Sequence, residues 1–514
     1  MLIYDLEKRG TKSIYEYLYE RIREDILRGV LKAGEKLPSK RSMAKDHGIA
    51  LITVENAYAQ LIIEGYVTAM EKRGYFVNAD VALQGGDALA GRDEGTAIRT
   101  ERQGDAATFG NQGGVSKATE GRIGDTMEFA GQDLPKVGVW TAGRTSKETP
   151  LPRREWLVDF SSSKLKKDAF PFATWTKLMR RVLDDREEAF LEKPEGKGVK
   201  ELREAIATYL RKAKGLDASP DRIIVGPGTE YLHHLILQLV GASRIVAVED
   251  PGYKKVGQIY ESHGLKCLHV PVDENGLMVE RLQGSNAKLV HLSPSHHFPT
   301  GCVMPISRRR ALLEWARGQG AYLLEDDYDS EFRFDGKPVP TLASLDDETV
   351  IYLNTFTKTL APSIRIAYMV LPERLLEQYE TKLNFYSGAV SSFDQYTLAV
   401  FIGEGYYERH VSRMRNYYRQ QRMKILSVLE ESPLAGRVLV EEHAAGLHFI
   451  LKVKGLRKDE TWLKKLEAKG IRLMPVSAYC YGVSEKYQHQ FVIYYSDLEE
   501  GNLREAFEIM ATLL

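Results

Sequence analysis

The stretch Thr355–Arg365, TFTKTLAPSIR, decides the fold of the C-terminal part of this chain together with Glu325–Tyr328, EDDY. Each follows an apolar run typical of a buried strand, so its polar side chains come where a strand ends. The two stretches supply an amine, a carboxylate, a phenol and a guanidinium. With such groups a protein holds pyridoxal phosphate: a lysine forms the Schiff base, an aspartate keeps the pyridine nitrogen protonated, and an arginine binds the phosphate.

Outward from these stretches, helical patterns and short apolar strands alternate from about residue 156 onward. Strand patterns lie at residues 222–225, 244–248, 288–292, 321–324 and 350–353. This alternation predicts an α/β domain over residues 156–514, with a mostly parallel sheet covered by helices and a small C-terminal subdomain. Ligands of such sheets collect at the carboxyl ends of the strands.

Further polar motifs follow these predicted strands. The motif Gly226–Thr229 opens a helix, where free amide groups and the helix dipole suit a phosphate. Tyr253 is placed to lie flat on a pyridine ring, and Thr355, Thr357 and Arg365 complete a phosphate cup. Taken singly, each motif has a plainer explanation, such as a glycine turn, an acidic helix cap or a surface lysine. Their combination is what predicts a cofactor site.

Composition limits the other possibilities. Lys plus Arg and Asp plus Glu both number 71, so any case for nucleic acid must be local. Cys267, Cys302 and Cys480 show no metal spacing, which predicts a reduced, cytoplasmic protein.

His296 and His297 are neighbours in an extended stretch and point to opposite sides, so no metal site is predicted. No apolar run approaches the roughly 18 residues of a membrane span.

The first 78 residues predict a winged helix-turn-helix, a DNA-binding module. Ile14, Leu18, Ile22 and Ile26 form the stripe of one amphipathic helix. A second helix ends at about residue 47, a third covers about 52–64, and two strands follow at 66–68 and 75–77. The third helix would enter the major groove at its N-terminal end. Residues placed to meet DNA are Lys40, Arg41, Thr53, Lys72 and Arg73, and the plainer alternative is that they are solvated surface groups.

Residues 79–155 are rich in Gly, Asp, Thr and Arg and lack apolar periodicity. This composition predicts a long flexible linker between the two domains.

The N-terminal motifs resemble a known family. The string LPSKR at 37–41, with Thr53, Tyr58 and GYFV at 74–77, is similar to the winged helix of GntR-type transcription regulators. The resemblance implies DNA contacts by Arg41 and Thr53, and wing contacts near Arg73 and Gly74. One position departs from the family: Leu51 stands where arginine is common, so a contact worth about 1–3 kcal/mol is expected to be missing.

Residues 158–510 resemble the fold type I aminotransferases. The resemblance implies that Lys358 forms the Schiff base, Asp326 pairs with the pyridine nitrogen, Tyr328 bonds the ring hydroxyl and Tyr253 stacks on the ring. It assigns the phosphate to Gly228, Thr229, Thr355 and Arg365. Phe298 stands where the family has an asparagine, which makes His297 a candidate for the second partner of the ring hydroxyl.

The domain order resembles the MocR/GabR regulators, as do SHHFPTG at 295–301, EDDYDSEF at 325–332 and AGLH at 445–448. The resemblance implies a head-to-tail homodimer and pyridoxal-phosphate-dependent control of transcription from a double-stranded DNA operator. It also implies a small amine or amino acid as effector.

One family feature is missing from the sequence. Val492 stands where aminotransferases place the arginine that binds the substrate carboxylate, and Arg413 or Arg415 are alternatives from elsewhere in the chain. We therefore expect that the effector is not an α-amino acid held in the usual way. Two functions remain: a regulator that senses the cofactor or an amine, and an active aminotransferase with an accessory DNA-binding module.

Overall fold

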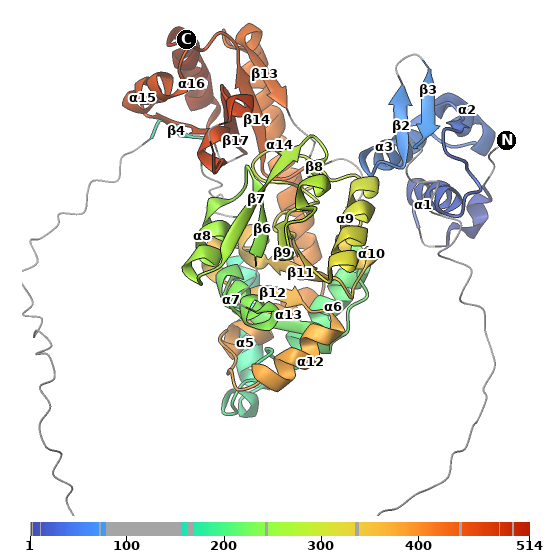
Figure 1. Ribbon diagram of the computed structural model, residues 1–514, viewed down its shortest axis with the longest axis vertical. Coiled ribbons are helices and arrows are strands. Elements are labelled where there is room, and N and C mark those ends of the chain that lie inside the picture. Colours follow the sequence, from blue (N-terminus) through green and yellow to red (C-terminus); the bar gives the residue numbers. More distant parts are fainter. Residues whose placement is uncertain are drawn as a thin grey trace, which may run out of the picture. The chain divides into compact units, whose positions relative to one another are not determined.

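The computed structural model describes residues 2, 4–10, 12–70, 73–78, 156–161, 169–241, 245–334, 339–441, 445–482, 484–495 and 498–514. Figure 1 labels the helices and strands of each part. The predicted linker at 79–155 and the predicted DNA contact Lys72 lie outside these residues.

The N-terminal module has the predicted order of helices and strands. Its helices are α1 (Ile14–Leu27), α2 (Lys40–His47) and α3 (Leu51–Ile63). Strands β1 (Lys36–Leu37), β2 (Val67–Met70) and β3 (Gly74–Val77) form an antiparallel sheet with β3 in the middle. The winged helix-turn-helix prediction is confirmed.

Local capping explains where these helices begin and end. Ser13 and Glu16 form a reciprocal capping box at the start of α1, and Ser39 accepts the Ser42 N–H at the start of α2. Gly48 ends α2 in the left-handed conformation, with φ of 60°. Leu18, Ile22, Val54, Tyr58 and Leu61 are among the buried side chains that hold the three helices together.

The large domain is built on an eight-stranded sheet of order β5-β12-β11-β10-β9-β6-β7-β8. Most neighbours are parallel, whereas β12 is antiparallel to both β5 and β11, and β8 is antiparallel to β7. The strands are β5 (Ile223–Gly226), β6 (Ile245–Asp250), β7 (Lys266–Asp273), β8 (Gly276–Leu277), β9 (Ala287–Leu292), β10 (Tyr322–Asp326), β11 (Val350–Thr355) and β12 (Ala367–Val370). The predicted mostly parallel α/β domain is confirmed.

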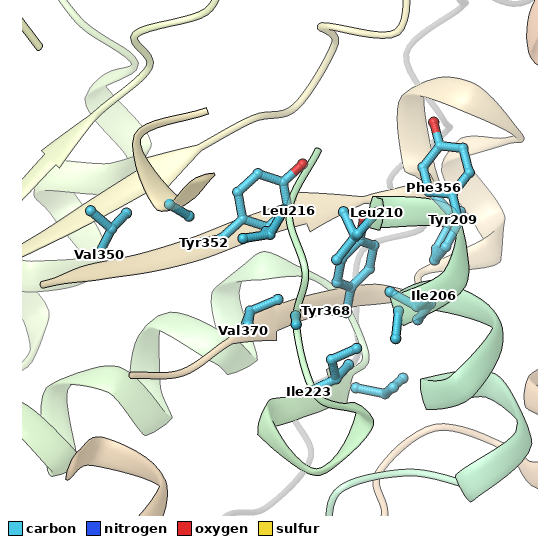
Figure 2. Close-up of a cluster of buried hydrophobic side chains, with 14 of the residues drawn as sticks. Ile206, Tyr209, Leu210, Leu216, Ile223, Val350, Tyr352, Phe356, Tyr368 and Val370 are labelled. Atoms are coloured by element: carbon cyan, nitrogen blue, oxygen red, sulfur yellow. The ribbon is translucent and has the colours of Figure 1, made fainter. Parts of the chain in front are cut away.

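Helices cover both faces of this sheet, which explains why its strands are apolar throughout. On one face Ile223, Tyr352 and Tyr368 share a core cluster with side chains of α6, as Figure 2 shows. That face is covered by α5 (Phe172–Asp185), α6 (Lys200–Lys214), α9 (Ile306–Gln319), α10 (Leu342–Leu345) and α13 (Ser392–Gly403). The opposite face packs against α7 (Thr229–Val240), α8 (Lys254–Ser262) and α12 (Glu373–Lys382).

The end of the chain forms the predicted small subdomain with its own core. Its antiparallel sheet has the order β13-β14-β17-β16, and β15 pairs with β4 (Val158–Asp159) from the start of the domain. The remaining elements are α14 (Tyr406–Glu431), β13 (Val438–Glu441), β14 (His448–Val453), α15 (Asp459–Ala468), β15 (Ile471–Arg472), β16 (Met474–Pro475), β17 (Gln490–Tyr494) and α16 (Glu500–Thr512). Within the described residues, no helix has the length and apolar character needed to cross a membrane.

Candidate cofactor site and DNA-binding helix

Strand register brings the predicted cofactor residues to one edge of the large sheet. Strand β10 ends at Asp326 beside Leu353 of β11, and β11 ends two residues later at Thr355. Ala367 at the start of β12 pairs with both Thr355 and Gly226, the last residue of β5. Helices follow β5 and β11 at this edge and a turn follows β10, so polar side chains that are far apart in sequence meet here.

The predicted phosphate residues surround Gly228. This glycine has φ of 98°, and a Cβ placed on it would lie 2.5 Å from Nη2 of Arg365. Arg365 is half exposed and itself has positive φ, 48°. The hydroxyl of Thr355 accepts the Thr357 N–H, 3.1 Å away, and Thr229 is the first residue of α7. A guanidinium, hydroxyls and a helix N-terminus suit a phosphate group.

An acidic side chain is the present partner of this arginine. Glu230 lies 2.8 Å from Arg365 Nη2 and also pairs with Lys255. Partial burial opposes its ionisation, but hydrogen bonds from Lys255 and Arg365 lower the pKa of Glu230 to about 2. Arg365 is therefore held over Gly228 by a charge that is always present near neutral pH.

Asp326 has one carboxylate oxygen paired and one unpaired. Its Oδ2 lies 3.5 Å from Nε2 of His291, and the His291 ring packs on His233 with 5.2 Å between centroids. Burial and the neighbouring His291 lower the pKa of His233 to about 3, so that ring is neutral. The buried Oδ1 of Asp326 finds no hydrogen-bond partner among the described residues. The residues therefore fit a ligand that brings an N–H to this oxygen, as a protonated pyridine does.

Lys358 lies in the short helix α11 (Phe356–Thr359), directly after β11. Burial lowers the pKa of its amine, while the carboxylate of Asp329 acts in the opposite direction. A lowered pKa raises the fraction of neutral amine, the form that attacks an aldehyde carbon.

The two predicted aromatic partners differ in exposure. The Tyr328 hydroxyl is 3.3 Å from Nδ1 of His296, and burial raises the pKa of this phenol. Tyr253 is 56% exposed and meets Phe298 edge to face, with 6.2 Å between ring centroids. An exposed ring next to a strand end is available to stack on a flat ligand.

The side chain of His297 contacts Thr300 and Glu249. Its Nδ1 is 2.7 Å from the Thr300 hydroxyl, and its Nε2 is 3.6 Å from Oε2 of Glu249. Burial and His296 lower the pKa of His297 to about 3. Its role as a partner of the cofactor ring hydroxyl stays a prediction, and His296 is the histidine that contacts Tyr328.

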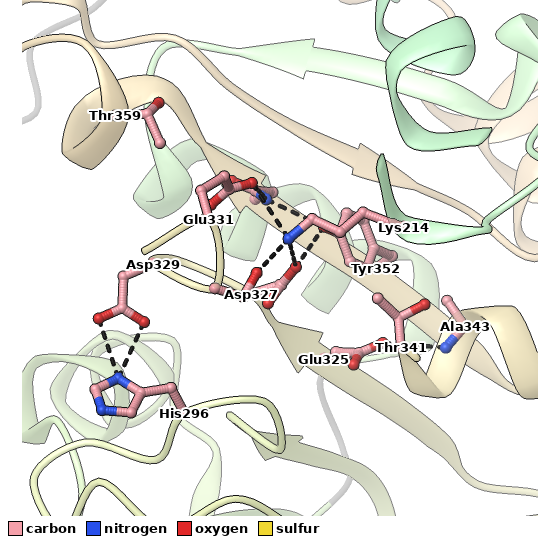
Figure 3. Close-up of polar contacts among 12 residues, drawn as sticks. Lys214, His296, Glu325, Asp327, Asp329, Glu331, Thr341, Ala343, Tyr352 and Thr359 are labelled. Carbon is pink, nitrogen blue, oxygen red and sulfur yellow. Dashed lines mark hydrogen bonds and ion pairs between the residues drawn. The ribbon is translucent and has the colours of Figure 1, made fainter. Parts of the chain in front are cut away.

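Sequence reasoning missed a buried ionic network behind the site, which Figure 3 shows. Lys214, the last residue of α6, places its ammonium 2.9 Å from Asp327 and 3.3 Å from Glu331. Tyr352 donates a hydrogen bond of 2.6 Å to the same Asp327 oxygen. Burial would lower the pKa of Lys214, but the two carboxylates outweigh it and raise the pKa above the ordinary value. The network ties α6 to the segment that carries Tyr328.

Alternation along the chain separates this network from the cofactor side. Glu325 accepts the N–H groups of Leu342 and Ala343, at 2.9 and 3.0 Å, and Asp327 faces Lys214. Asp326 and Tyr328 therefore point to the other side, because successive side chains of an extended segment alternate. The acidic run at 325–327 was the sequence signal, but the partner Lys214 lies more than a hundred residues away.

The position expected for a carboxylate-binding arginine is apolar in the structure. Val492 lies in β17, buried against Ile450 and Val476. The two alternatives are engaged elsewhere: Arg413 donates to the Ala169 carbonyl at 3.0 Å, and Arg415 donates to the Glu331 carbonyl at 2.9 Å.

The predicted DNA-contacting residues lie on α2, α3 and the wing. Arg41 and Arg73 are exposed and Thr53 is half-buried near the N-terminus of α3. Lys40 is 3.5 Å from Glu55, and Gly74 begins β3 with φ of 111°. Leu51 and Ile52 are 39% and 61% exposed, so the first turn of α3 presents apolar side chains to its surroundings.

Two family models match the chain: "Bacterial regulatory proteins, gntR family" over residues 14–77, and "Aminotransferase class I and II" over residues 157–508. The uncharacterized HTH-type transcriptional regulator YdeL of Bacillus subtilis (strain 168) is 30% identical over 506 residues, covering 96% of this chain and 95% of that protein. The probable rhizopine catabolism regulatory protein MocR of Rhizobium meliloti is 31% identical over 474 residues, covering 92% and 88%. The chain belongs to the MocR-type transcription regulators.

Solved structures agree with the fold of the second domain in this MocR-type regulator. The multiple substrate aminotransferase from Thermococcus profundus superimposes with a TM-score of 0.61 at 24% identity, covering 69% of this chain and 90% of that one. At this identity the likeness shows the fold alone. The MocR-type regulator thus joins a gntR-family helix-turn-helix to a fold type I aminotransferase-like domain.

Proposed function

We propose that this MocR-type regulator binds pyridoxal phosphate on Lys358 and changes its affinity for operator DNA when an amine or amino acid effector reaches the cofactor. The observation that carries the proposal is the buried Oδ1 of Asp326, which has no partner among the described residues, at the sheet edge that also holds Lys358. Leaving a buried carboxylate oxygen unpaired costs free energy, and a protonated pyridine nitrogen would supply the missing donor.

The remaining roles follow from the same arrangement. Tyr328 would bond the ring hydroxyl, with His297 as its proposed second partner, and Tyr253 would stack on the ring. The phosphate would be held by Gly228, Thr229, Thr355, Thr357 and Arg365, displacing Glu230 from the arginine. When bound, the cofactor supplies an electron sink for an amine that condenses with it.

On the DNA side, we propose that α3 enters the major groove, with contacts from Lys40, Arg41, Thr53, Lys72, Arg73 and Gly74. Residues 1–78 would form the DNA-binding domain and residues 156–514 the cofactor domain. We propose a cytoplasmic head-to-tail homodimer, which presents two such modules to double-stranded DNA. An effector shifts the DNA-competent population only if it binds one arrangement better than the other.

The first experiment is the visible absorption spectrum of the full-length protein with pyridoxal phosphate. We expect a yellow band that is absent from Lys358→Ala and weakened in Asp326→Asn. Lys382→Ala, which removes a lysine at the end of α12, is the matched control and should keep the band. A wild-type protein without the band would overturn the proposal.

The second experiment measures DNA binding to the region upstream of the protein's own coding sequence. We expect Arg41→Ala to weaken binding and reduce its salt dependence, because one phosphate or base contact is lost. Arg28→Ala, at the end of α1, is the control and should bind as wild type does. Equal binding by both variants would contradict the proposed DNA-facing surface.

A second candidate function is an active aminotransferase. The lowered pKa of Lys358 favours it, since the same amine can accept and donate a proton at the α-carbon. Turnover separates the two: with an amine and a keto acid, an enzyme accumulates product over many cycles, whereas a sensor changes its spectrum once and then stops.

A further inference from the structure

The region where an aminotransferase would bind a substrate carboxylate is built differently here, and what it could bind extends the proposed function. Phe298 and Val492 occupy the two positions where the family places an asparagine and an arginine. In the structure both belong to one apolar cluster, in which Phe298 packs against the group that contains Val492, Ile450 and Val476. A carboxylate placed here would lose water without gaining a guanidinium.

Aromatic rings surround Phe298 on the side of the cofactor site. The centroid of the Phe298 ring lies 6.2 Å from Tyr253, 4.7 Å from Tyr479 and 6.3 Å from Tyr494. Aromatic faces attract cations and offer nothing to an anion.

Phe298 and these tyrosines form an aromatic wall, to which His448 adds a buried hydrogen-bond acceptor. Its ring centroid is 5.3 Å from that of Phe298, and its Nε2 lies 2.9 Å from the carbonyl oxygen of Pro299. Because a carbonyl only accepts, Nε2 carries the proton, and burial lowers the pKa of His448 so that the ring is neutral. Nδ1 is then an acceptor, and it is buried without a hydrogen-bond partner in the described part of the chain.

His296 has a second buried ring nitrogen without a hydrogen-bond partner among the described residues, and this ring lies next to the carboxylate of Asp329. Its Nδ1 lies 3.1 Å from both carboxylate oxygens of Asp329, as Figure 3 shows, and therefore carries a proton. Its Nε2 is buried and has no hydrogen-bond partner among the described residues. The centroids of the His296 and His448 rings are 4.9 Å apart. Gly446 leaves room for the His296 ring, because a Cβ on this glycine would lie 1.8 Å from Cε1 of His296.

Two of these side chains interact electrostatically with Lys358, the reacting amine of the proposed site. Asp329 influences the pKa of Lys358, and Lys358 in turn influences that of His448. The wall, which also includes His296 and Asp329, thus combines one acceptor nitrogen, a second buried nitrogen without a hydrogen-bond partner among the described residues, one buried carboxylate and several aromatic faces. We propose that the effector is a diamine. One amino group would replace the Lys358 amine on the aldehyde carbon of the cofactor, so that a new C=N bond forms as the C=N bond to the lysine breaks and the lysine is released as an amine. The second amino group, as an ammonium, donates to His448 and His296 beside Asp329. This inference rests on the proposed cofactor site.

The test compares three ligands of equal chain length on the full-length protein loaded with pyridoxal phosphate. Putrescine ends in an ammonium, γ-aminobutyrate in a carboxylate and butylamine in a methyl group. The apparent Kd of each is read from the change in the visible band. We expect putrescine to bind at least about tenfold more tightly than either of the others, a difference of about 1.4 kcal/mol.

Variants then assign the selectivity to the wall. His448→Leu should bring the Kd of putrescine close to that of butylamine, while butylamine itself changes little. Asp329→Asn should also remove the preference, which is read as the ratio of the two Kd values because Asp329 acts on Lys358 as well. His448→Gln keeps an acceptor and should retain part of the preference. A general disturbance of the fold would weaken all three ligands alike and leave their ratio unchanged.

The outcomes separate the two proposals. If the protein shows no cofactor band, the proposed function fails before any effector is tested. If the band forms but γ-aminobutyrate or butylamine binds as tightly as putrescine, the diamine inference is wrong and the proposed cofactor role stands.

Discussion

At the scale of single residues, the proposed phosphate cup depends on the absence of a side chain at one position. Gly228 is buried with φ of 98°, and the guanidinium of Arg365 lies where its Cβ would be. Any larger residue would displace Arg365 as well as strain the backbone.

We therefore predict that Gly228→Ala lowers the affinity for pyridoxal phosphate by about tenfold or more, as one displaced charged contact would do. Gly215→Ala is the matched control: Gly215 also has positive φ, 65°, but no atom lies within 4 Å of its would-be Cβ. Titration of the visible band measures both. Equal losses in the two variants would mean that backbone strain, not Arg365, limits binding.

A second residue-scale prediction concerns pH. Burial raises the pKa of Glu249 to about 8 from an ordinary value of 4.5, despite the hydrogen bond that it accepts from the Ser293 N–H. The folded protein thus holds a proton that the unfolded chain releases above pH 4.5. The resulting stability is fully present below pH 4.5 and is lost as the pH rises towards 8.

The neighbouring His297 changes stability with pH in the opposite direction, because burial lowers its pKa. Its pKa is about 3 in the folded protein and 6.5 in the unfolded chain, so His297 does not change the stability above pH 6.5. Between pH 6.5 and 8, Glu249 should lower the free energy of unfolding by about 1.4 kcal/mol per pH unit. The midpoint temperature of thermal unfolding should fall less steeply with pH over this window in Glu249→Gln than in the wild-type protein. Parallel curves would show that Glu249 is ionised in the folded protein.

At the scale of elements, the segment after β10 is held from one side by α6. Lys214 pairs with both Asp327 and Glu331, and all three side chains are almost fully buried. Removing one partner of a buried ionic group leaves the others uncompensated, which typically destabilises a protein by about 3–5 kcal/mol.

We accordingly predict that Lys214→Met lowers the unfolding free energy of the large domain by about that amount and weakens cofactor binding through Tyr328. Lys212→Met changes an exposed lysine on the same helix and should have little effect. Chemical unfolding followed by tryptophan fluorescence provides the comparison. A wild-type-like Lys214→Met protein would show that the network contributes nothing net.

Element boundaries show what a sequence pattern can and cannot locate. The amphipathic stripe of Ile14, Leu18, Ile22 and Ile26 predicted α1 within a residue or two of Ile14–Leu27. The sequence pattern does not locate β7, β8 and β12 of the large sheet. The four residues of β12 are apolar or aromatic and follow the stretch Thr355–Arg365 with no separate turn motif between them. Their pairing with β5 therefore comes from the tertiary fold.

At the scale of the whole molecule, the regulator joins a gntR-family helix-turn-helix and an aminotransferase-like domain, which carries the proposed cofactor site, on one chain. Coupling between them requires that occupancy of one site change the affinity of the other, and the coupling free energy is reciprocal. Couplings of this kind are typically about 1–3 kcal/mol, or 5- to 150-fold in affinity.

We predict that pyridoxal phosphate with an effector amine changes the Kd for upstream DNA within this range in the wild-type protein. Lys358→Ala should bind DNA with an affinity that no longer responds to either compound. Fluorescence anisotropy with labelled DNA at fixed salt measures the change. If the wild-type Kd for DNA did not change with cofactor and amine, DNA binding would be independent of the proposed sensing.

The sequence by itself determined the order of the two domains, the strand-end placement of Asp326 and Lys358, and the absence of arginine at 492. Those features are local, because periodicity, capping residues and glycine turns act within a few residues of chain. Only the tertiary structure decided that Lys214 meets Asp327, 113 residues away, and that Asp326 lies against His291. It also brought His448 beside His296. No local pattern records such pairs, since burial and charge compensation select them only when distant segments pack together.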